Sequence, residues 1–598
     1  MSNRPVFEID GRFLYYAFLA GGNKILENQS EINRINVFPV NDKDTGTNLA
    51  STVRSVLDNI RPHKSYKTTV ENIAEAALIG ARGNSGVIFA QFLYGMSRET
   101  RNTPVVTFAE FAASIKRSIP YMYEAISNPV EGTMLTVIKE WSDFISDERH
   151  TINDFKKIII ESLEVLKQSL METKTKLKVL AQSNFVDAGA KGFVLFIEGI
   201  IDFIQSRNIR QLVVQQPELV SLIHTEEMVD DKINFRYCTE AILRNCSVDK
   251  PVLKDFLSQN GDSVVVAGSN SLCRLHVHSN EPAELFYKLK NYGTITFQKV
   301  DDMVRQHETA TQRKWNIAIV TDSTCDLSDE LLDFYQINVV PLNLNFGENH
   351  FLDKVTIKPE QFYEMLESSN EFPKTSQINE RAFTNVYSHL ASHYDAVISL
   401  HVSSHFSGTY LSSVRAGARI ASEFNKPVVV IDSKTLSGSL GLVVLRVAQA
   451  IESGWSLEKI TNATDQWKKD AKIFVSVKDL KYMIKGGRVS KNKGFVANLL
   501  GVNPIVSVTE NGKSILFGQA FSQKGNINKV MKHVTKISKN RSIWNYIVLH
   551  AHNESGAAIY TEWMVKLTGK QPISVVNISP VIGMNAGIGT IAVSLMFE

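Results

Sequence analysis

The chain has 598 residues, of which 43% are hydrophobic and 21% charged, and its formal net charge is +3. This length predicts three or four domains, and because no block of like charge stands out, nothing favours nucleic-acid binding. The first ten residues lack an apolar signal segment, no apolar run reaches the ~20 residues of a membrane span, and the 4 cysteines make no disulfide framework. We therefore expect a cytoplasmic multidomain protein, for which peripheral contact with anionic membrane stays open.

Residues 1–210 are expected to form an all-helical domain. Apolar residues recur three and four positions apart, as in Phe13, Tyr16, Ala17 and Ala20, which is the helical period. Four polar, glycine-containing loops interrupt this pattern, at residues 36–48, 80–86, 129–135 and 185–192.

The first two loops have the composition of metal and phosphate sites. Asp42 and Asp44 stand two apart in a loop, where their carboxylates can converge on Mg²⁺; an acidic helix cap explains this loop equally well. Residues 80–86 open an apolar helix with small residues, whose backbone N–H groups suit phosphate.

In order and spacing, the four loops resemble the ATP-binding domain of the dihydroxyacetone kinase family, most closely the N-terminal domain of bacterial fatty acid kinases, over residues 7–205. The resemblance implies an eight-helix barrel holding ATP and Mg²⁺, with Asp42 and Asp44 as catalytic magnesium ligands and Asn36 as an outer ligand. It implies nucleotide contacts by Asn48, Asn84, Ser85, Gly86, Thr133, Met134, Asp187 and Gly189. The chain departs from the family at Asn41 and Lys43, where Pro and Gly are usual; Lys43 either pairs with phosphate or weakens metal binding.

Residues 211–308 are expected to form a small α+β domain, with strands at residues 263–267 and 273–278, helices near residues 251–259 and 283–292, and a linker at residues 306–314. Residues two apart on a strand share a face, so His276 and His278 can bind one Zn²⁺ with Cys238 as third ligand. The alternative is two half-exposed histidines beside a buried thiol. The segment resembles the central domain of fatty acid kinases, which raises the weight of the zinc hypothesis.

From residue 315 onward, short apolar strands alternate with helical segments, which predicts a parallel sheet covered by helices. The strands are expected at residues 317–320, 397–400, 428–431, 474–477 and 546–550. Residues 506–517 instead predict a hairpin turning at residues 510–513. Its Asn-Gly-Lys-Ser sequence is not a P-loop, because Ser507 stands where the first glycine is required.

Polar loops in this region have the composition of a carboxylate site at the mouth of an apolar tunnel. Hydroxyls and one arginine bind a carboxylate with little loss of side-chain entropy. We expect head-group contacts from Thr375, Ser407 and Arg488, with Ser376 and Ser404 as alternatives. A surface arginine in a Gly-rich turn is the other interpretation of Arg488.

Five ordered motifs over residues 315–598 resemble the DegV family of fatty-acid-binding proteins: residues 320–327, 373–377, 403–410, 486–490 and 580–589. The resemblance implies an α/β fold of two lobes and adds Gly408 and Asn585 to the fatty-acid-binding residues. Asn585 replaces the histidine usual in the family; it can donate a hydrogen bond but carries no charge.

The combined resemblances predict a fatty acid kinase fused to its own substrate-binding domain, transferring phosphate from ATP to a fatty acid carboxylate for phospholipid synthesis. Two alternatives remain: a lipid-binding regulator with an inactive kinase domain, and a kinase of a small hydroxylated substrate such as dihydroxyacetone. A membrane acyltransferase that uses acyl phosphate is the expected partner. Transfer within one chain and transfer across a homodimer both remain open.

Overall fold

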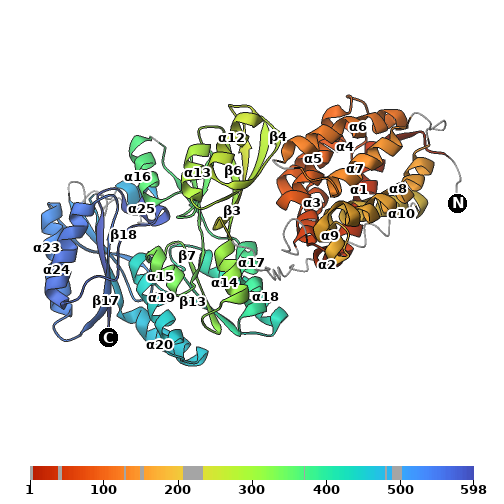
Figure 1. Cartoon of the computed structure of the whole chain (residues 1–598). Helices are drawn as coiled ribbons and strands as arrows, with labels where there is room; N and C mark the ends of the chain where they lie inside the picture. Colours follow the sequence, from red (N-terminus) through yellow and green to blue (C-terminus); the bar gives the residue numbers. More distant parts are fainter. Residues whose placement is uncertain are drawn as a thin grey trace. The chain divides into compact units, whose positions relative to one another are not determined.

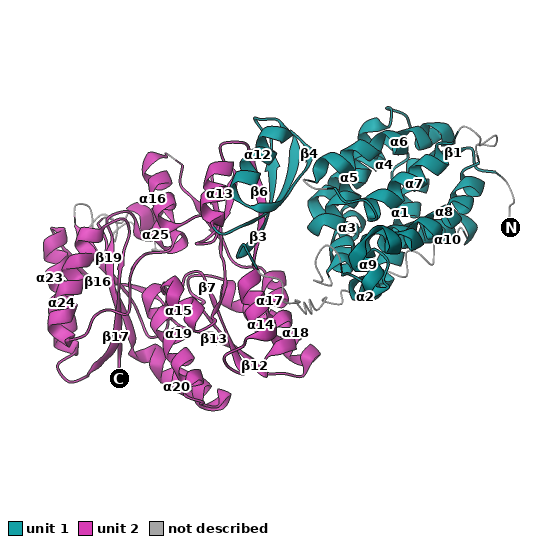
Figure 2. Cartoon of the chain, in the orientation of Figure 1, with its two compact units in different colours: residues 1–280 teal, residues 281–598 magenta. Residues whose placement is uncertain are grey.

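The structure is a computed structural model that describes residues 5–37, 44–126, 129–147, 154–206, 233–369, 371–478, 481–487 and 502–598. The chain forms two compact units, residues 1–280 and residues 281–598 (Figures 1 and 2). Within the described residues, no helix is both long and apolar enough to cross a bilayer.

The first unit is mainly helical, as predicted. Its elements are β1 (Glu8–Asp10), α1 (Gly11–Glu27), α2 (Gln29–Arg34), α3 (Thr45–Asn59), α4 (Tyr66–Gly80), α5 (Gly83–Glu99), β2 (Val105–Thr107), α6 (Phe108–Ala125), α7 (Met134–Ile145), α8 (Phe155–Lys176), α9 (Lys178–Ser183), α10 (Ala188–Ser206), β3 (Tyr237–Arg244), α12 (Lys250–Asn260), β4 (Asp262–Ser269) and β5 (Leu272–Ser279). Eight of the described helices (α1, α3 to α8 and α10) have 12 residues or more, in agreement with the expected eight-helix domain.

Local sequence explains where these helices begin. Asp10 accepts the N–H of Phe13 at the start of α1, and Ser65 caps α4 in the same way. Thr107 and Glu110 form a reciprocal capping box at α6. The short antiparallel pair β1–β2 was not predicted, because three-residue strands give no periodic signal.

The predicted hairpin of the central segment is confirmed. Strands β4 and β5 pair antiparallel, β3 pairs with the other edge of β5, and α12 lies where a helix was expected. This small sheet packs on the helices of the first unit, since Ile242 and Val265 join the helical core. The Gly268 N–H also donates to the Gln91 side chain at 3.0 Å.

The second unit contains α13 (Pro282–Leu289), β6 (Thr294–Asp302), α14 (Met303–Thr311), β7 (Ile317–Asp322), α15 (Asp329–Phe334), β8 (Asn338–Val340), β9 (Asn343–Phe346), β10 (Asn349–Leu352), α16 (Pro359–Ser368), β11 (Lys374–Ser376), α17 (Glu380–His393), β12 (Ala396–His401), α18 (Thr409–Phe424) and β13 (Val428–Asp432). It continues with α19 (Ser437–Glu452), α20 (Leu457–Asp470), β14 (Ala471–Ser476), α21 (Lys481–Lys485), β15 (Asn503–Val508), β16 (Ser514–Ala520), α23 (Gln523–Ile537), β17 (Ile543–His550), α24 (Glu554–Thr568), β18 (Val575–Asn577), α25 (Pro580–Ala586) and β19 (Ile591–Phe597).

The prediction of one parallel sheet is only half right. A four-stranded sheet of order β13-β12-β7-β8 is parallel throughout. Strands β14 and β17, however, belong to a second sheet of order β16-β15-β14-β19-β17-β18, in which β19 lies antiparallel to both. Strand β19, at the chain end, is buried throughout, so its apolar run gave no sign of direction. The predicted β15–β16 hairpin is confirmed.

The predicted linker at residues 306–314 is wrong. Most of it forms α14, whose first turn is capped by Asp302 accepting the N–H of Arg305. Arg305 pairs with Asp333 at 2.7 Å, and Thr309 is fully buried. Polar composition suggested a linker, but here the polar side chains are paired within the second unit.

Candidate functional site

The N-terminus of α3 gathers three predicted residues of the first unit. Asp44 is the N-cap residue, and the Asn48 amide donates to its carboxylate at 2.7 Å. Asn36 is buried and accepts the Thr45 hydroxyl at 2.8 Å. Carboxylate and amide oxygens are the hard donors that Mg²⁺ takes, so these residues fit that ion. Asp42, the other predicted ligand, lies outside the described residues.

The N-terminus of helix α5 contacts the first turns of α3. Gly83 has a left-handed φ of 53°, and a Cβ there would lie 2.2 Å from the Asn48 side-chain nitrogen. A Cβ on Gly86 would lie 2.7 Å from the Thr52 hydroxyl oxygen. These two glycines therefore let α5 start in direct contact with α3. The N-cap residue Arg82 makes no side-chain hydrogen bond to the α5 N-terminus, so backbone N–H groups there are available to an anion.

Helices α7 and α10 start at the same point. A Cβ on Gly189 would lie 3.2 Å from both Ser85 Oγ and Met134 Cε, and 3.3 Å from Asp187 Oδ1. Three residues predicted to contact the nucleotide, each from a different loop, thus meet around a fourth, Gly189. With α3 and α5, four helix N-termini converge, and their dipoles favour a polyphosphate.

Asp187 ties two of these N-termini together. Its carboxylate accepts the Ala190 N–H at 2.8 Å and the N–H groups of Met134 and Gly189. Burial raises the pKa of Asp187 to about 6, against the opposing effect of these donors. These bonds give Asp187 the role of joining the loops that precede α7 and α10. Thr133, the N-cap residue of α7, donates its hydroxyl to the Val130 carbonyl at 2.8 Å.

Cys238, His276 and His278 form a cluster on the small sheet. Cys238 stands opposite His278 across β3 and β5, and the ligand atoms of the three residues lie within 4.8 Å of one another. His278 Nδ1 is 3.3 Å from the Asp262 carboxylate, an arrangement that orients a metal-binding imidazole. One thiolate and two imidazoles are a donor set that fits Zn²⁺.

A buried ion pair adjoins this cluster. Arg274 donates to the Glu240 carboxylate at 2.6 Å and to the Ile79 carbonyl at 2.9 Å, and it is 3% exposed. Ile79 lies at the C-terminal end of α4, directly before the turn that opens α5. Because Arg274 satisfies an otherwise unpaired helix carbonyl, it fixes the position of that turn within the first unit.

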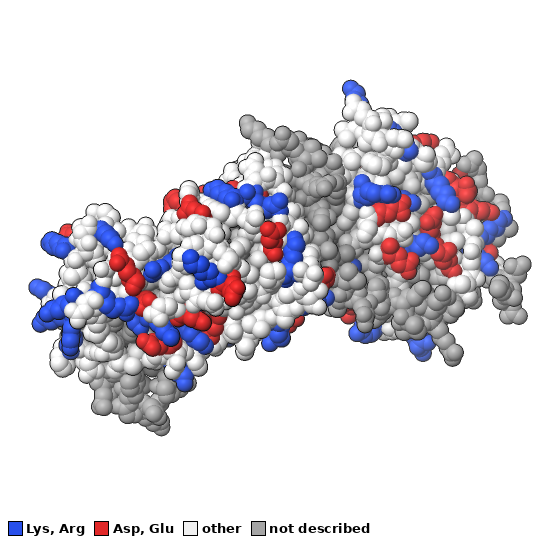
Figure 3. All heavy atoms as spheres, turned by 90° about the horizontal axis from the view of Figure 1, so that it is seen from below, with Lys and Arg blue, Asp and Glu red and all other residues white. Residues whose placement is uncertain are grey.

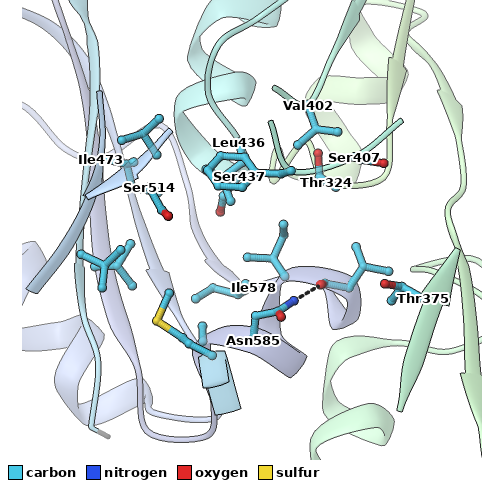
Figure 4. Close-up of a pocket in the computed structure, with 18 of the residues that line it drawn as sticks. Thr324, Thr375, Val402, Ser407, Leu436, Ser437, Ile473, Ser514, Ile578 and Asn585 are labelled. Carbon is cyan, nitrogen blue, oxygen red and sulfur yellow. Dashed lines mark hydrogen bonds between the residues drawn. The ribbon is translucent and has the colours of Figure 1, made fainter. Parts of the chain in front are cut away.

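The second unit contains a cavity of about 370 Å³ (Figure 4). One wall consists of the loops that follow β7, β12 and β13, at the carboxyl edge of the parallel sheet, where α/β proteins place their ligands. The other wall is formed by β14, β15, β19 and α25. Ile473 and Val475 of β14, and Val477 directly after it, line the cavity, whereas Phe474 packs under α23 and α24, as strand alternation requires.

Hydroxyl groups line both walls of this cavity. Figure 4 shows Thr324, Thr375 and Ser407 on the wall opposite Ile473, and Ser514 beside Ile473. The N-cap residues of α18 and α19, Gly408 and Leu436, make no side-chain capping bond, and the Thr409 N–H of α18 donates to Ser407 Oγ at 3.2 Å. None of the described lining residues is ionisable, so a bound carboxylate would be held by hydroxyls and helix N–H groups.

Most predicted fatty-acid-binding residues line this cavity: Thr375, Ser376, Ser407, Gly408 and Asn585. Ser404 does not; its N–H donates to the Asp432 carboxylate at 3.3 Å. Arg488 lies outside the described residues. Gly486, the first residue of the same motif, nevertheless lies next to the cavity. A Cβ on Gly486 would lie 1.9 Å from Oδ1 of Asn585, which lines the cavity. The Asn585 amide donates to the Val581 carbonyl at 3.1 Å.

Sequence reasoning missed several polar lining residues: Thr324, Gln377, Ser437, Ser507 and Ser514. Thr324 and Gln377 lie within the DegV-like motifs. They could have been identified from the rule that α/β proteins bind ligands at the carboxyl edge of the parallel sheet. Ser437 follows β13 on the same edge, with a left-handed φ of 57°. The two hairpin serines needed the strand register, which the sequence does not provide.

A buried polar network supports the cavity walls. Asp326 accepts the Ser437 hydroxyl at 2.6 Å and pairs with Lys354 at 2.7 Å. Asp353 accepts the Val581 N–H of α25 at 3.2 Å. These bonds hold the starts of α19 and α25, which both border the cavity.

The network predicts a pH-dependent stability. Burial raises the pKa of Asp353 from 3.8 to about 7, with Lys354 opposing. The folded state therefore keeps a proton that the unfolded chain loses above pH ~4, and stability falls as pH rises to ~7. Asp353→Asn removes this loss, so its thermal midpoint relative to wild type should rise between pH 5 and pH 8, by an amount equivalent to about 2 kcal/mol. Thermal unfolding of both proteins measures this difference. A difference between variant and wild type that stays constant from pH 5 to pH 8 would show that Asp353 of the folded protein is ionised at both pH values.

Comparison with protein families divides the chain into three matched parts. Residues 39–202 match the DAK2 domain, residues 234–310 match the fatty acid kinase-like middle domain, and residues 316–598 match the DegV family.

Individual relatives match about half of the chain. The protein YloV of Bacillus subtilis is 31% identical over 314 residues, covering 50% of this chain and 56% of its own length. An uncharacterized protein of Staphylococcus saprophyticus is 29% identical over 336 residues, covering 53% of this chain and 60% of its own length. The chain thus spans a little over half the length of these relatives.

Solved structures match about half of the chain. DegV, a fatty-acid-binding protein of Bacillus subtilis, is 30% identical and covers 48% of this chain and 100% of its own, with a TM-score of 0.43. A fatty-acid-binding DegV family protein of Thermus thermophilus is 28% identical and covers 47% of this chain and 100% of its own, with a TM-score of 0.44. By the family matches, the chain is a fusion of a DAK2 domain, a fatty acid kinase-like middle domain and a DegV-family domain.

Proposed function

We propose that this chain is an ATP-dependent fatty acid kinase that binds its substrate in its own DegV-family domain. One observation carries the proposal: a single chain joins a domain in which four helix N-termini converge to a domain with a largely apolar cavity that hydroxyl groups also line. The first arrangement suits a nucleotide phosphate, and the second suits a fatty acid. The family matches of the DAK2, middle and DegV domains support the same pairing.

The chemistry needs no general base. A carboxylic acid with an ordinary pKa near 4 is ionised at neutral pH, so one of its oxygens can attack the γ-phosphorus of ATP directly. The new C(O)O–P bond forms as the bond to the β–γ bridging oxygen breaks, releasing ADP and acyl phosphate. Lining hydroxyls of Thr375 and Ser407 orient the carboxylate, and the N-termini of α5 and α7 bind the phosphates.

Magnesium would be held by Asp44 and Asn36, with Asp42 as a further ligand, and would neutralise phosphate charge. Acyl phosphate is a reactive mixed anhydride, so the proposal includes a membrane acyltransferase that consumes it. Joining both domains in one polypeptide raises the effective concentration of the acyl chain at the kinase site.

Stimulation of ATP consumption tests this proposal against the two alternatives. The purified chain should consume ATP faster when oleate is added and not when dihydroxyacetone is added. Stimulation by dihydroxyacetone alone would make it a kinase of small hydroxylated substrates. Oleate binding without ATP consumption would make it a lipid-binding protein with an inactive kinase domain.

Gly189→Val should weaken nucleotide binding at least about tenfold, because a Cβ at this position already lies 3.2 Å from Ser85 and Met134. Binding of a fluorescent ATP analogue gives the readout. Asp202→Val, at an exposed position of the same helix, is the matched control and should bind normally. Equal affinities for wild type and Gly189→Val would place the nucleotide elsewhere.

We also propose that Cys238, His276 and His278 bind one zinc ion that links β3 to β5. The purified chain should contain about one equivalent of zinc, and Cys238→Ser should lose most of it, since three ligands leave little redundancy. Elemental analysis is the measurement, and Cys246→Ser, a half-buried cysteine of the same unit, is the control. Zinc retained in Cys238→Ser, or absent from wild type expressed with zinc, contradicts the proposal.

A further inference from the structure

A long stretch of the second unit contains only basic charge. Residues 511–553 include no Asp or Glu, and their cations are Lys513, Lys524, Lys529, Lys532, Lys536, Lys539 and Arg541. These cations do not stand out as a block of like charge in the sequence, because they are spaced along the chain rather than consecutive. Figure 3 shows basic side chains gathered over the part of the second unit that carries α23.

Helix α23 collects four of these lysines on one side. Its buried residues are Asn526, Ile527, Val530 and Val534. At about 100° per residue, Lys524, Lys529, Lys532 and Lys536 fall within an arc of about 140° opposite that buried side. All four are exposed, and none forms an ion pair with an acidic residue in the described part of the chain. Arg541, by contrast, pairs with Asp470.

Exposed apolar side chains lie beside the lysines. Phe521, directly before the N-cap Ser522 of α23, is 91% exposed. Strand β16 is an edge strand of the six-stranded sheet and carries Ile515 and Phe517, 43% and 39% exposed. The Phe517 ring packs 4.3 Å from the His533 ring of α23, so strand and helix present one continuous surface. A nearly fully exposed phenylalanine, together with the exposed Ile515 and Phe517 of the same strand region, is characteristic of an interaction surface.

We propose that this basic face (Lys524, Lys529, Lys532 and Lys536 of α23, with Phe521, Ile515 and Phe517) docks on a bilayer containing anionic lipids. The lysines bind the lipid phosphates by charge complementarity, and Phe521 inserts between the head groups, as aromatic anchors of interfacial helices do. An apolar Ile515 and a projecting Phe521 fit a lipid interface better than the phosphate backbone of a nucleic acid.

The same strands connect docking to the cavity. Ser514 of β16 and Val506 and Val508 of β15 line it, so the docked hairpin is also part of the cavity wall. The cavity lies on the other face of this sheet, since Val475 lines it whereas Phe474 and Phe517 pack on the α23 side. Docking depends on charge and exposed apolar area alone, so it stands or falls separately from the proposed kinase activity.

Vesicle sedimentation of the full chain tests the proposal. The chain should partition onto phosphatidylcholine vesicles containing about a third phosphatidylglycerol and at least about tenfold less onto phosphatidylcholine alone. The quadruple variant with Lys524, Lys529, Lys532 and Lys536 each changed to Gln should lose at least about tenfold of the anionic partitioning. Phe521→Ser should lose several-fold, while its remaining binding stays sensitive to salt.

A matched variant controls for net charge. It changes to Gln four lysines that pair with acids elsewhere: Lys116, Lys288, Lys358 and Lys468. This control should partition like wild type, and both quadruple variants should bind oleate normally in detergent. Equal loss in the control, equal binding to neutral vesicles, or binding to a single-stranded oligonucleotide but not to vesicles would each overturn the proposal.

Discussion

Asp44→Ala should lower ATP-dependent phosphate transfer to oleate at least about 100-fold, because it removes a charged oxygen ligand from the proposed magnesium site. Asp44 lies at the start of α3, beside Asn36 and in contact with Asn48. Oleate binding should be unchanged, since the cavity lies wholly within the second unit. Initial rates with labelled ATP, together with an oleate-binding titration, measure both effects.

Asp44→Asn is the informative companion variant. It retains an oxygen that can accept the 2.7 Å bond from Asn48 while losing the charge, so it should fold normally and be nearly as inactive as Asp44→Ala. Glu71→Ala, at an exposed acidic residue of α4, should keep wild-type activity. If Asp44→Ala stays within about threefold of wild type, Asp44 does not hold a catalytic metal.

Val475→Trp should lower oleate affinity at least about 30-fold by filling the cavity with an indole. Val475 lies on the cavity side of β14 and is only half-buried, so the larger side chain has space there and should cost little stability compared with overpacking a closed core. Oleate titration by isothermal calorimetry gives the affinity, and binding of a fluorescent ATP analogue should not change.

Val475→Ala is the control for this position. It enlarges the same wall without blocking it, so it should retain oleate binding while changing the preference among chain lengths. Normal oleate affinity in Val475→Trp, with thermal unfolding like that of wild type, would mean that the fatty acid binds outside this cavity.

The sequence pointed to the loops that meet at the starts of α5, α7 and α10 because short glycine-containing motifs carry their own geometry; nucleotide binding by these loops stays a prediction. In residues 80–86, Gly83 has a left-handed φ of 53°, which lets α5 begin in contact with α3. The sequence could not show that Asp187 binds three backbone N–H groups, because that role depends on how α7 and α10 meet.

The cavity was predicted less completely, for a reason of topology. Thr375, Ser407 and Asn585 were identified from motifs, but the opposite wall comes from β14, β15 and β19. Residues 474–477, at the end of β14, were assigned to a parallel sheet, whereas β14 pairs antiparallel with both β15 and β19. Strand β15 was expected only as half of a hairpin, and β19 was not predicted. Buried strands with apolar residues on both faces do not reveal their direction, so the facing residues could not be chosen from the sequence.

Formation of acyl phosphate by the purified chain alone tests the central claim most directly. The chain, supplied with ATP, Mg²⁺ and oleate but no separate carrier protein, should produce an acyl phosphate that hydroxylamine traps as the hydroxamate, with one ADP formed per hydroxamate. No hydroxamate, even after addition of a separate fatty-acid-binding protein and with oleate shown to be bound, would contradict the claim that this chain is a fatty acid kinase.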